Sequence, residues 1–191
     1  HLFGTSFQNE QQFNEGRVVT QDGFRFRLRQ DDIAEVIGYS GSGKELDIPE
    51  TVQGHVVTRV APFAFSRQRQ ITAVSIPDTV DSIGQEAFYI CPSLQQLKLP
   101  ARLKIIGKNA FNYCRALKSV IVPTGTIHID RHAFYDCTAL KTISIPDAVG
   151  FMGEKVFGAD GDAKVECTIV CRQDSYVEHY AKENGILCSF V

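Results

Sequence analysis

Three cysteines recur at a fixed spacing in the middle of the chain, and cysteine thiolates are good zinc ligands. They are Cys91, Cys114 and Cys137, each 23 residues after the last. Zinc needs a tetrahedral set of ligands, whereas residues that recur at one period in a stacked repeat lie in a row. The spacing therefore favours small buried side chains that fill one column of a core, and we predict thiols without a bound metal.

The other three cysteines, Cys167, Cys171 and Cys188, lie outside this column. Cys167 and Cys171 are four residues apart, so they face the same side of a predicted strand. A disulfide among the three is compatible with the sequence, but the spacing does not decide whether one forms.

A glycine- and serine-rich segment, residues 38–44, has most of the pattern of a phosphate-binding loop. That chemistry needs Ser or Thr after the lysine to hold a metal, and a helix whose N-terminus faces the phosphates. Glu45 takes the hydroxyl position, and residues 46–49 predict a strand that ends at a proline. Ser42 also breaks the glycine pattern of a hydrolase nucleophile elbow. We therefore expect an ordinary turn, with no cofactor bound.

Two histidines four residues apart, His128 and His132, have Asp130 and Asp136 nearby, a combination that suggests a metal or an acid–base pair. The argument requires a helix between the two histidines. No helix is expected there, and both histidines occupy positions that vary between the copies of the repeat described below, as surface positions do. We predict a surface role for both, nominate no catalytic residue, and expect that the chain is not an enzyme.

The main signal in the sequence is an internal repeat of 23 residues. An Ala-Phe pair recurs at 64–65, 87–88, 110–111 and 133–134, with Val156-Phe157 as the fifth copy. Proline follows the same period, as do several aliphatic columns. The prolines are Pro77, Pro100, Pro123 and Pro146, and one aliphatic column is Val74, Leu97, Val120 and Ile143.

Each repeat predicts a strand, a proline corner, a second extended stretch and a short helical turn. Leu97-Lys98-Leu99 alternates apolar and polar side chains, as a strand does, and Pro100 ends the pairing. Residues 86–91 are too few for an isolated helix, so burial of Phe88 and Cys91 must hold the turn. Stacked copies would place like residues about 4.8 Å apart and bury one continuous core.

The segment LQQLKLPARLKIIGKNAFNYC, residues 94–114, resembles the BspA-type, or treponemal-type, leucine-rich repeat of bacteria. The resemblance covers about residues 46–166. Gln68 and Asp160 stand where the pattern has cysteine, and Asp130 where it has glycine. The resemblance implies an α/β, strand-rich, right-handed solenoid of about five repeats, with parallel strands on a concave face. It also implies adhesion or protein recognition at a bacterial surface, since related proteins are associated with binding host matrix proteins.

Atypical sequence at both ends predicts caps that cover the exposed core. We expect an N-terminal arm and hairpin in residues 1–45, repeats in 46–166 and a C-terminal cap in 167–191. In the first part, residues 24–28 and 33–37 predict a hairpin, whereas 1–17 show no clear period and are expected to be a mobile arm or a small capping element. A five-residue insertion lies around Gly54-His55. Ser175 and Glu178 have capping-box spacing, and Asn184-Gly185 predicts the end of that helix.

Composition restricts the partners. The 20 Lys and Arg and 22 Asp and Glu give a net charge of -2, which offers no general attraction for nucleic acid. No run approaches the roughly 18 apolar residues of a membrane span, so no membrane insertion is expected. The chain begins with His1, and its one methionine is Met152. A removed export signal would explain this start and would place the protein outside the cell or on its surface, but an arbitrarily chosen first residue would explain it equally well.

The outward side chains of the parallel strands are the predicted partner-binding surface. They are polar and slightly basic, and no aromatic residue is among them, which favours a protein over a glycan as the partner. A structural role in the cell envelope and polysaccharide binding remain alternatives. The predicted residues are Ala73, Ser75, Gln96, Lys98, Lys118, Ser119, Ile121, Lys141, Thr142 and Ser144.

Overall fold

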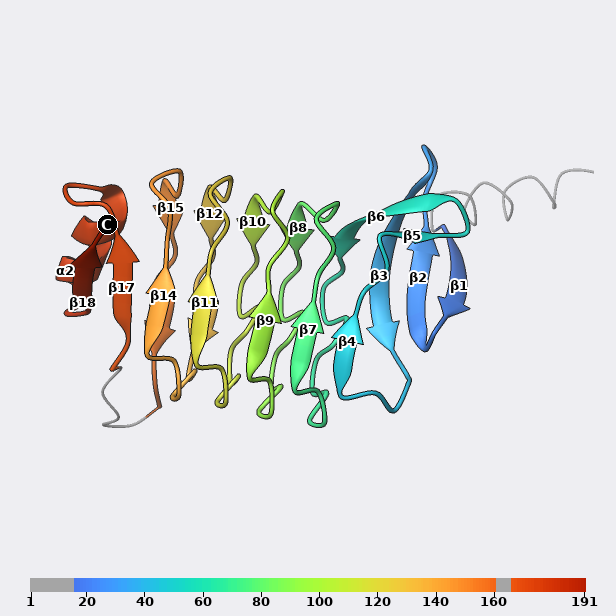
Figure 1. The fold of residues 1–191 in the computed structure, drawn as a ribbon, viewed down its shortest axis with the longest axis horizontal. Coiled ribbons are helices and arrows are strands. Elements are labelled where there is room, and N and C mark those ends of the chain that lie inside the picture. The colour runs from blue at the N-terminus through green and yellow to red at the C-terminus, as the bar shows by residue number, and fades with distance from the viewer. Residues whose placement is uncertain (1–15, 161–165) are drawn as a thin grey trace, which may run out of the picture.

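The computed structural model describes residues 16–160 and 166–191, and in it the chain winds into a rod of stacked rungs (Figure 1). The predicted leucine-rich-repeat solenoid is confirmed. An arm or small capping element was predicted for residues 1–17. Residues 1–15 of that segment lie outside the described part of the chain.

One side of the rod carries short parallel strands that follow the proline period. Each residue pairs with its equivalent one repeat later, for example Ala73 with Gln96 and Ser119 with Thr142. The strands form two hydrogen-bonded sheets, β4-β7-β9 and β11-β14-β17-β18. They are β4 (Glu45–Asp47), β7 (Ala73–Ser75), β9 (Gln96–Lys98), β11 (Ser119–Ile121), β14 (Thr142–Ser144), β17 (Thr168–Cys171) and β18 (Leu187–Phe190).

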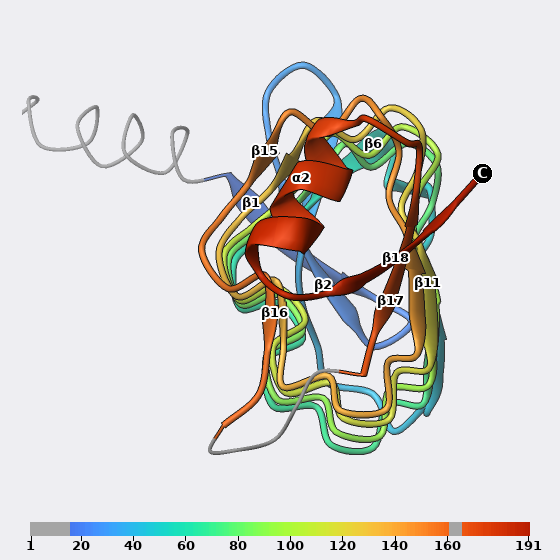
Figure 2. The same cartoon turned by 90° about the vertical axis from the view of Figure 1, so that its left-hand side faces the viewer.

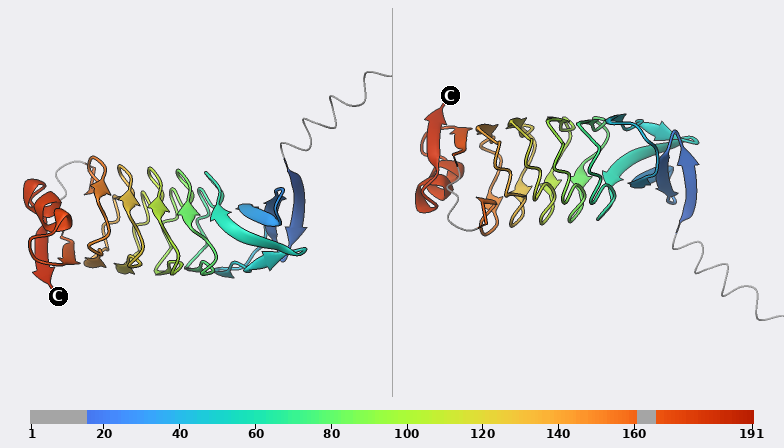
Figure 3. Two further views of the ribbon diagram at one scale, coloured as in Figure 1. Left: turned by 90° about the horizontal axis from the view of Figure 1, so that it is seen from above. Right: turned by 90° about the horizontal axis from the view of Figure 1, so that it is seen from below.

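A second ladder runs along another side of the rod (Figure 3). It consists of β6 (His55–Val60), β8 (Ser82–Ile83), β10 (Ile105–Ile106), β12 (His128–Ile129) and β15 (Phe151–Met152), all parallel. A two-stranded ladder joins β13 (Phe134–Tyr135) to β16 (Phe157–Gly158). The proline corners and tight turns connect these ladders within each rung.

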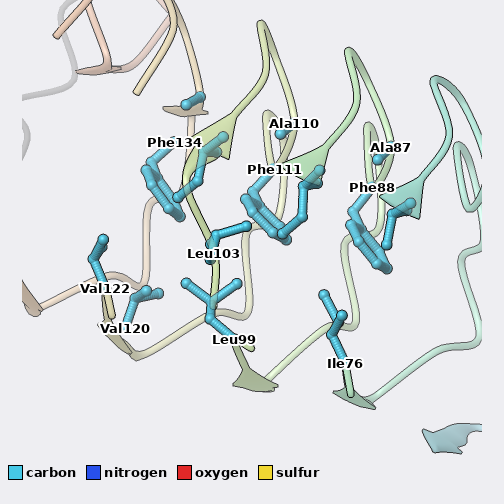
Figure 4. Packing of buried hydrophobic residues seen from close by; sticks show 14 of the residues in the cluster. Ile76, Ala87, Phe88, Leu99, Leu103, Ala110, Phe111, Val120, Val122 and Phe134 are labelled. Atoms are coloured by element: carbon cyan, nitrogen blue, oxygen red, sulfur yellow. The ribbon is translucent and has the colours of Figure 1, made fainter. Parts of the chain in front are cut away.

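The core lies inside the rod and is built from the periodic apolar columns (Figure 4). The phenylalanines of the Ala-Phe pairs stack ring over ring, with centroid distances of 4.9, 5.2, 5.3 and 6.0 Å from Phe65 to Phe157. The inner members Phe88 and Phe111 have no exposed surface. Equivalent side chains thus lie over one another, as the period predicted.

The expected short helical turn is the one element of the repeat that the structure corrects. Residues 86–91 form consecutive tight turns, with Ala87 N–H donating to Gly84 O and Tyr89 N–H donating to Glu86 O. Between them, the Phe88 N–H donates to Ala110 O of the next rung at 2.8 Å. An α-helix would need that N–H for itself. Because every second N–H bonds to the next rung, the segment cannot be helical.

The predicted hairpin at the N-terminal end is present and has one strand more than expected. β2 (Phe24–Leu28) pairs antiparallel with β3 (Ile33–Tyr39), and β1 (Arg17–Gln21) pairs antiparallel with β2. β3 joins the second ladder through β6. The five-residue insertion forms a small hairpin of β5 (Thr51–Val52) with β6. These strands cover the first rung of the core.

The predicted capping helix, α2 (Tyr176–Glu183), lies across the other end of the rod (Figure 2). Ser175 is its N-cap and accepts a hydrogen bond from Glu178 N–H, and the Glu178 carboxylate accepts one from Asp174 N–H. Asn184 ends the helix, and Gly185 follows with a φ of 65°. Apolar side chains of α2 close the last rung of the core. The strands predicted before and after this helix are β17 and β18.

Candidate binding face

Strands β7, β9, β11 and β14, which carry or adjoin the ten residues predicted to bind a partner, lie on one side of the rod (Figure 1). We call this side the strand face. It consists of the outward side chains of β4, β7, β9, β11 and β14, together with Lys118 and Lys141 beside them. All ten are exposed or half-exposed. Ile121 is the exposed aliphatic side chain expected from the sequence, with 76% of its surface accessible. The structure therefore brings the predicted residues together, while their binding role stays a prediction.

A shallow groove crosses the N-terminal part of the strand face over β4, β7 and β9. Its floor is β7, whose outward side chains Ala73 and Ser75 are small. Longer side chains on the neighbouring strands, Glu45 and Asp47 on β4 and Lys98 on β9, border the floor. The groove thus exists because small side chains alternate with long ones across three adjacent strands.

The charge of the strand face differs from the slightly basic surface expected. Glu45 and Asp47 extend the face by one strand and make that end acidic. Lys141 forms an ion pair with Glu166, with 2.7 Å between Nζ and Oε2. The hydrogen bond from Lys141 lowers the pKa of Glu166. Lys98 and Lys118 form no ion pair with any described residue, so they carry the positive charge of the face.

The strand face also has a discontinuity that the regular period does not predict. β9 and β11 are neighbours, yet they belong to different hydrogen-bonded sheets. Leu97 on β9 is only half-buried, whereas its equivalents Val74 and Val120 are buried. The grooved part and the Ile121 part of the face are therefore two adjoining patches.

Comparison with known proteins identifies the repeat. A family model described as "BspA type Leucine rich repeat region" matches residues 39–164 in six copies. The chain belongs to this BspA-type leucine-rich repeat family. The family model finds one copy more than the five expected from the Ala-Phe pairs. Strands β17 and β18 also continue the ladder beyond the last Ala-Phe-like pair, Val156-Phe157.

Solved structures of other bacterial leucine-rich repeat proteins are similar. A leucine-rich cell surface protein from Faecalibacterium prausnitzii is 28% identical with a TM-score of 0.67, covering 83% of this chain and 46% of its own. A leucine-rich repeat protein from Bacteroides capillosus is 26% identical with a TM-score of 0.57, covering 75% and 99%.

A T. pallidum leucine-rich repeat protein is 22% identical with a TM-score of 0.59, covering 91% of this chain and 98% of its own, and shows likeness of fold alone. No curated protein matches the chain. These comparisons fit a binding or recognition module. No helix in the described part of the chain is long and apolar enough to cross a membrane.

The cysteine column of this BspA-type chain is a column of buried thiols, as predicted. Each Sγ–H donates to a phenylalanine carbonyl of the preceding rung: Cys91 to Phe65, Cys114 to Phe88 and Cys137 to Phe111, at 3.1–3.3 Å. Burial raises the pKa of Cys91 to about 12 and that of Cys114 well above its usual range. The three thiols stay protonated and fill the core. Cys167, Cys171 and Cys188 are also free thiols.

The other two candidate chemistries resolve into structural roles. The glycine-rich segment is a turn between β3 and β4, and it folds around Tyr39, whose hydroxyl accepts a hydrogen bond from Gly43 N–H at 3.0 Å. A strand follows, where a phosphate loop needs a helix N-terminus. His128 lies on β12 in the second ladder, and His132 lies on a tight turn with a φ of 57°. Among the described residues, no three His, Cys, Asp or Glu side chains gather as a metal site would require.

Proposed function

We propose that this chain is a non-catalytic binding module at a bacterial cell surface, and that it recognises a protein through the strand face. The observation that carries the proposal is the groove over β4, β7 and β9. Its floor of small side chains lies open on a rigid sheet, and one border is acidic while the other carries Lys98. A partner that presents both charges on an extended segment would complement it.

The proposed location rests on relatives. The F. prausnitzii protein of similar structure is a cell surface protein, and this chain spans 46% of its length. BspA-type proteins are associated with adhesion, so a host matrix protein is the partner class that we test first. A structural role in the cell envelope and polysaccharide binding are the alternatives, and the capture experiment described below tests glycans beside proteins.

A protein suits the strand face better than a glycan does. Glycan sites favour aromatic platforms, and no outward side chain of β4, β7, β9, β11 or β14 is aromatic. The face instead offers Ile121, which would contribute apolar area to a protein interface, and polar side chains around it.

The test is affinity capture with the purified chain against immobilised matrix proteins and a glycan array in parallel, followed by titration of each ligand captured. Ala73→Trp fills the groove from a half-exposed position, and we expect it to weaken protein binding by more than about tenfold. Ala148→Trp adds the same side chain at an exposed corner outside the strand face, so it should bind as the wild type does. Capture of glycans alone, or equal binding by the two variants, would refute the proposal.

Charge reversal provides a second arm. Lys98→Glu with Lys118→Glu should weaken binding to a partner with an acidic segment and should reduce the salt dependence of that binding. Arg102→Glu, at an exposed corner, is the matched control. If reversal at Lys98 and Lys118 changes binding no more than Arg102→Glu does, the face is not the site.

A further inference from the structure

A second group of side chains, far richer in aromatics than the strand face, gathers on the tight turns of the rod. We call it the turn face and define it as Arg67, Arg69, Tyr89, Tyr113, Arg115 and Tyr135. Tyr89 and Tyr135 share one column of the repeat, Arg67 and Tyr113 a second, and Arg69 and Arg115 a third. The three tyrosines are half-exposed and the three arginines are exposed. The fold requires none of these types at the turns, because other copies carry Ser66, Pro92 or Thr138 there.

Contacts fix the tyrosine rings in place. The carboxylate of Asp160 accepts a hydrogen bond from the Tyr113 hydroxyl and one from the Tyr135 hydroxyl, the latter at 3.3 Å. The Tyr135 hydroxyl also donates to Ala159 O at 2.9 Å. The ring of Tyr89 packs edge-on against Tyr113, with 5.9 Å between centroids. One carboxylate thus holds two aromatic rings from neighbouring rungs, and a third ring packs against one of them.

The arginines provide charge beside these rings. The Arg115 guanidinium lies 5.2 Å from the centroid of the Tyr113 ring, and its Nε donates to Asp136 at 2.7 Å. Asp136 is almost completely buried, so Arg115 neutralises it. Arg67 and Arg69 form no ion pair within the described residues. Their two charges are therefore available to a ligand at the N-terminal end of the turn face.

We propose that the turn face binds an acidic glycan laid along the rod, with a carboxylate or sulfate at Arg67 and Arg69 and sugar rings against Tyr89 and Tyr113. Tyrosine presents a large apolar ring with a polar tip, which suits the mixed surface of a sugar. Guanidinium groups match the geometry of carboxylate and sulfate oxygens. Neighbouring rungs are spaced by about 4.8 Å along one line, an arrangement that a linear polymer can follow.

This site is separate from the protein-binding role proposed above, because it uses other columns of the repeat. An acidic peptide would satisfy the arginines, but it would not require the ordered tyrosine rings. The tyrosines therefore favour the glycan.

The experiment measures binding of the full chain to heparin as a sulfated probe, polygalacturonate as a carboxylated probe, and dextran as a neutral one. We expect binding to at least one acidic glycan and none to dextran. Tyr113→Asn removes the ring at a position with a φ of 63°, where asparagine is well tolerated. It should weaken binding about tenfold, whereas Tyr113→Phe, which keeps the ring but loses the hydrogen bond to Asp160, should weaken binding less.

Arg67→Gln with Arg69→Gln should also weaken binding about tenfold and lower its salt dependence. Arg102→Gln with Arg131→Gln removes two exposed arginines outside the turn face and is the matched control. Circular dichroism melts verify that each variant is folded. The strand-face variant Ala73→Trp should leave glycan binding unchanged, which separates this site from the protein site.

Four results would overturn the proposal. The first is that the wild type binds neither acidic glycan. The second is that poly-glutamate, an acidic polymer without sugar rings, binds as tightly as the better of the two glycans. The third is that Tyr113→Asn binds as the wild type does. The fourth is equal loss in the control arginine pair, which would show non-specific charge attraction instead of a site.

Discussion

The phenylalanine stack should carry a large share of the stability of the rod, and Phe111→Ala is the perturbation that measures it. Phe111 has no exposed surface and lies between two parallel rings, 5.2 Å from Phe88 and 5.3 Å from Phe134. Truncation to alanine removes the whole ring from the middle of the core. The backbone on both sides is fixed by hydrogen bonds between rungs, so the site cannot collapse around the void.

Two contributions set the magnitude. Truncation of a buried phenylalanine to alanine costs about 3–5 kcal/mol through lost transfer free energy and the remaining cavity. Each lost ring contact adds about 0.5–1.5 kcal/mol, part of which the first figure already contains. A loss of about 4–5 kcal/mol is a large fraction of the roughly 5–15 kcal/mol that stabilises a typical domain. We therefore expect Phe111→Ala to unfold at a much lower urea concentration than the wild type.

Urea denaturation followed by far-ultraviolet circular dichroism measures the free energy of unfolding, and tyrosine fluorescence provides a second probe because the chain has no Trp. Phe157→Ala is the graded comparison. Phe157 has a single stacked neighbour at 6.0 Å and is 6% exposed, so its truncation should cost about 1–2 kcal/mol less. Ile121→Ala, on the exposed strand face, should change stability by less than about 0.5 kcal/mol.

The reasoning fails if Phe111→Ala costs less than about 1 kcal/mol, or if Phe157→Ala costs more than Phe111→Ala. Either result would mean that the aromatic column is not a continuous core and that the rungs derive their stability elsewhere. Coincident curves from the two probes establish that the unfolding is cooperative enough for the comparison.

Two further predictions concern titration. Burial raises the pKa of Cys91 to about 12 and shifts the Cys114 and Cys137 thiols in the same direction, so the unfolded chain releases these protons first as pH rises. The free energy of unfolding should fall above about pH 9, by up to about 1.4 kcal/mol per pH unit for each thiol. Urea midpoints measured from pH 8 to 11 should therefore decrease with pH, and they should decrease less steeply in Cys114→Ala. In the C-terminal cap, hydrogen bonds from Lys182 and from the Asp174 backbone N–H lower the pKa of Glu178 in the folded chain. The Glu178 carboxylate therefore stabilises the fold above about pH 4.3, and this stabilisation is lost as pH falls through the pKa of the folded state. Glu178→Gln should remove that part of the acid dependence, and an unchanged acid limb would contradict the assignment.

Much of the fold follows from the sequence because the period itself states which residues lie over one another. Once Phe88 and Phe111 are known to be equivalent, the strands, corners and core columns of every rung follow together. The capping helix was predictable for a different reason, since Ser175, Asn184 and Gly185 are local signals that act within a few residues. The strand-face residues could be found because strand alternation separates inward from outward side chains.

The turn geometry could not be found in the same way. Residues 86–91 contain no glycine, and their apolar spacing suits a helical turn as well as tight turns. Carbonyls of the neighbouring rung decide between the two, and those lie 22 residues away, as with Phe88 N–H and Ala110 O. Left-handed backbone recurs at the period of the repeat, and no glycine marks it in any copy: the residues are Phe63, Glu86, Asn109, His132 and Lys155. Strand β1 was not predicted, although the sequence holds a signal for it. Asp22-Gly23, with φ of 51° and 82°, is a hairpin turn between β1 and β2.

The same argument explains where binding sites can form on this rod. The inward columns are aliphatic, aromatic or thiol in nearly every copy, because each must fill the same space between two rungs. The outward columns have no such constraint, and their types change from rung to rung: Ala73 aligns with Gln96, and Arg67 with Tyr113. Ala73→Trp and Tyr113→Asn therefore change what the surface can bind without touching the stack that Phe111→Ala would break. Loss of binding in the first two variants, with stability kept, would show that recognition and folding use different columns of one repeat.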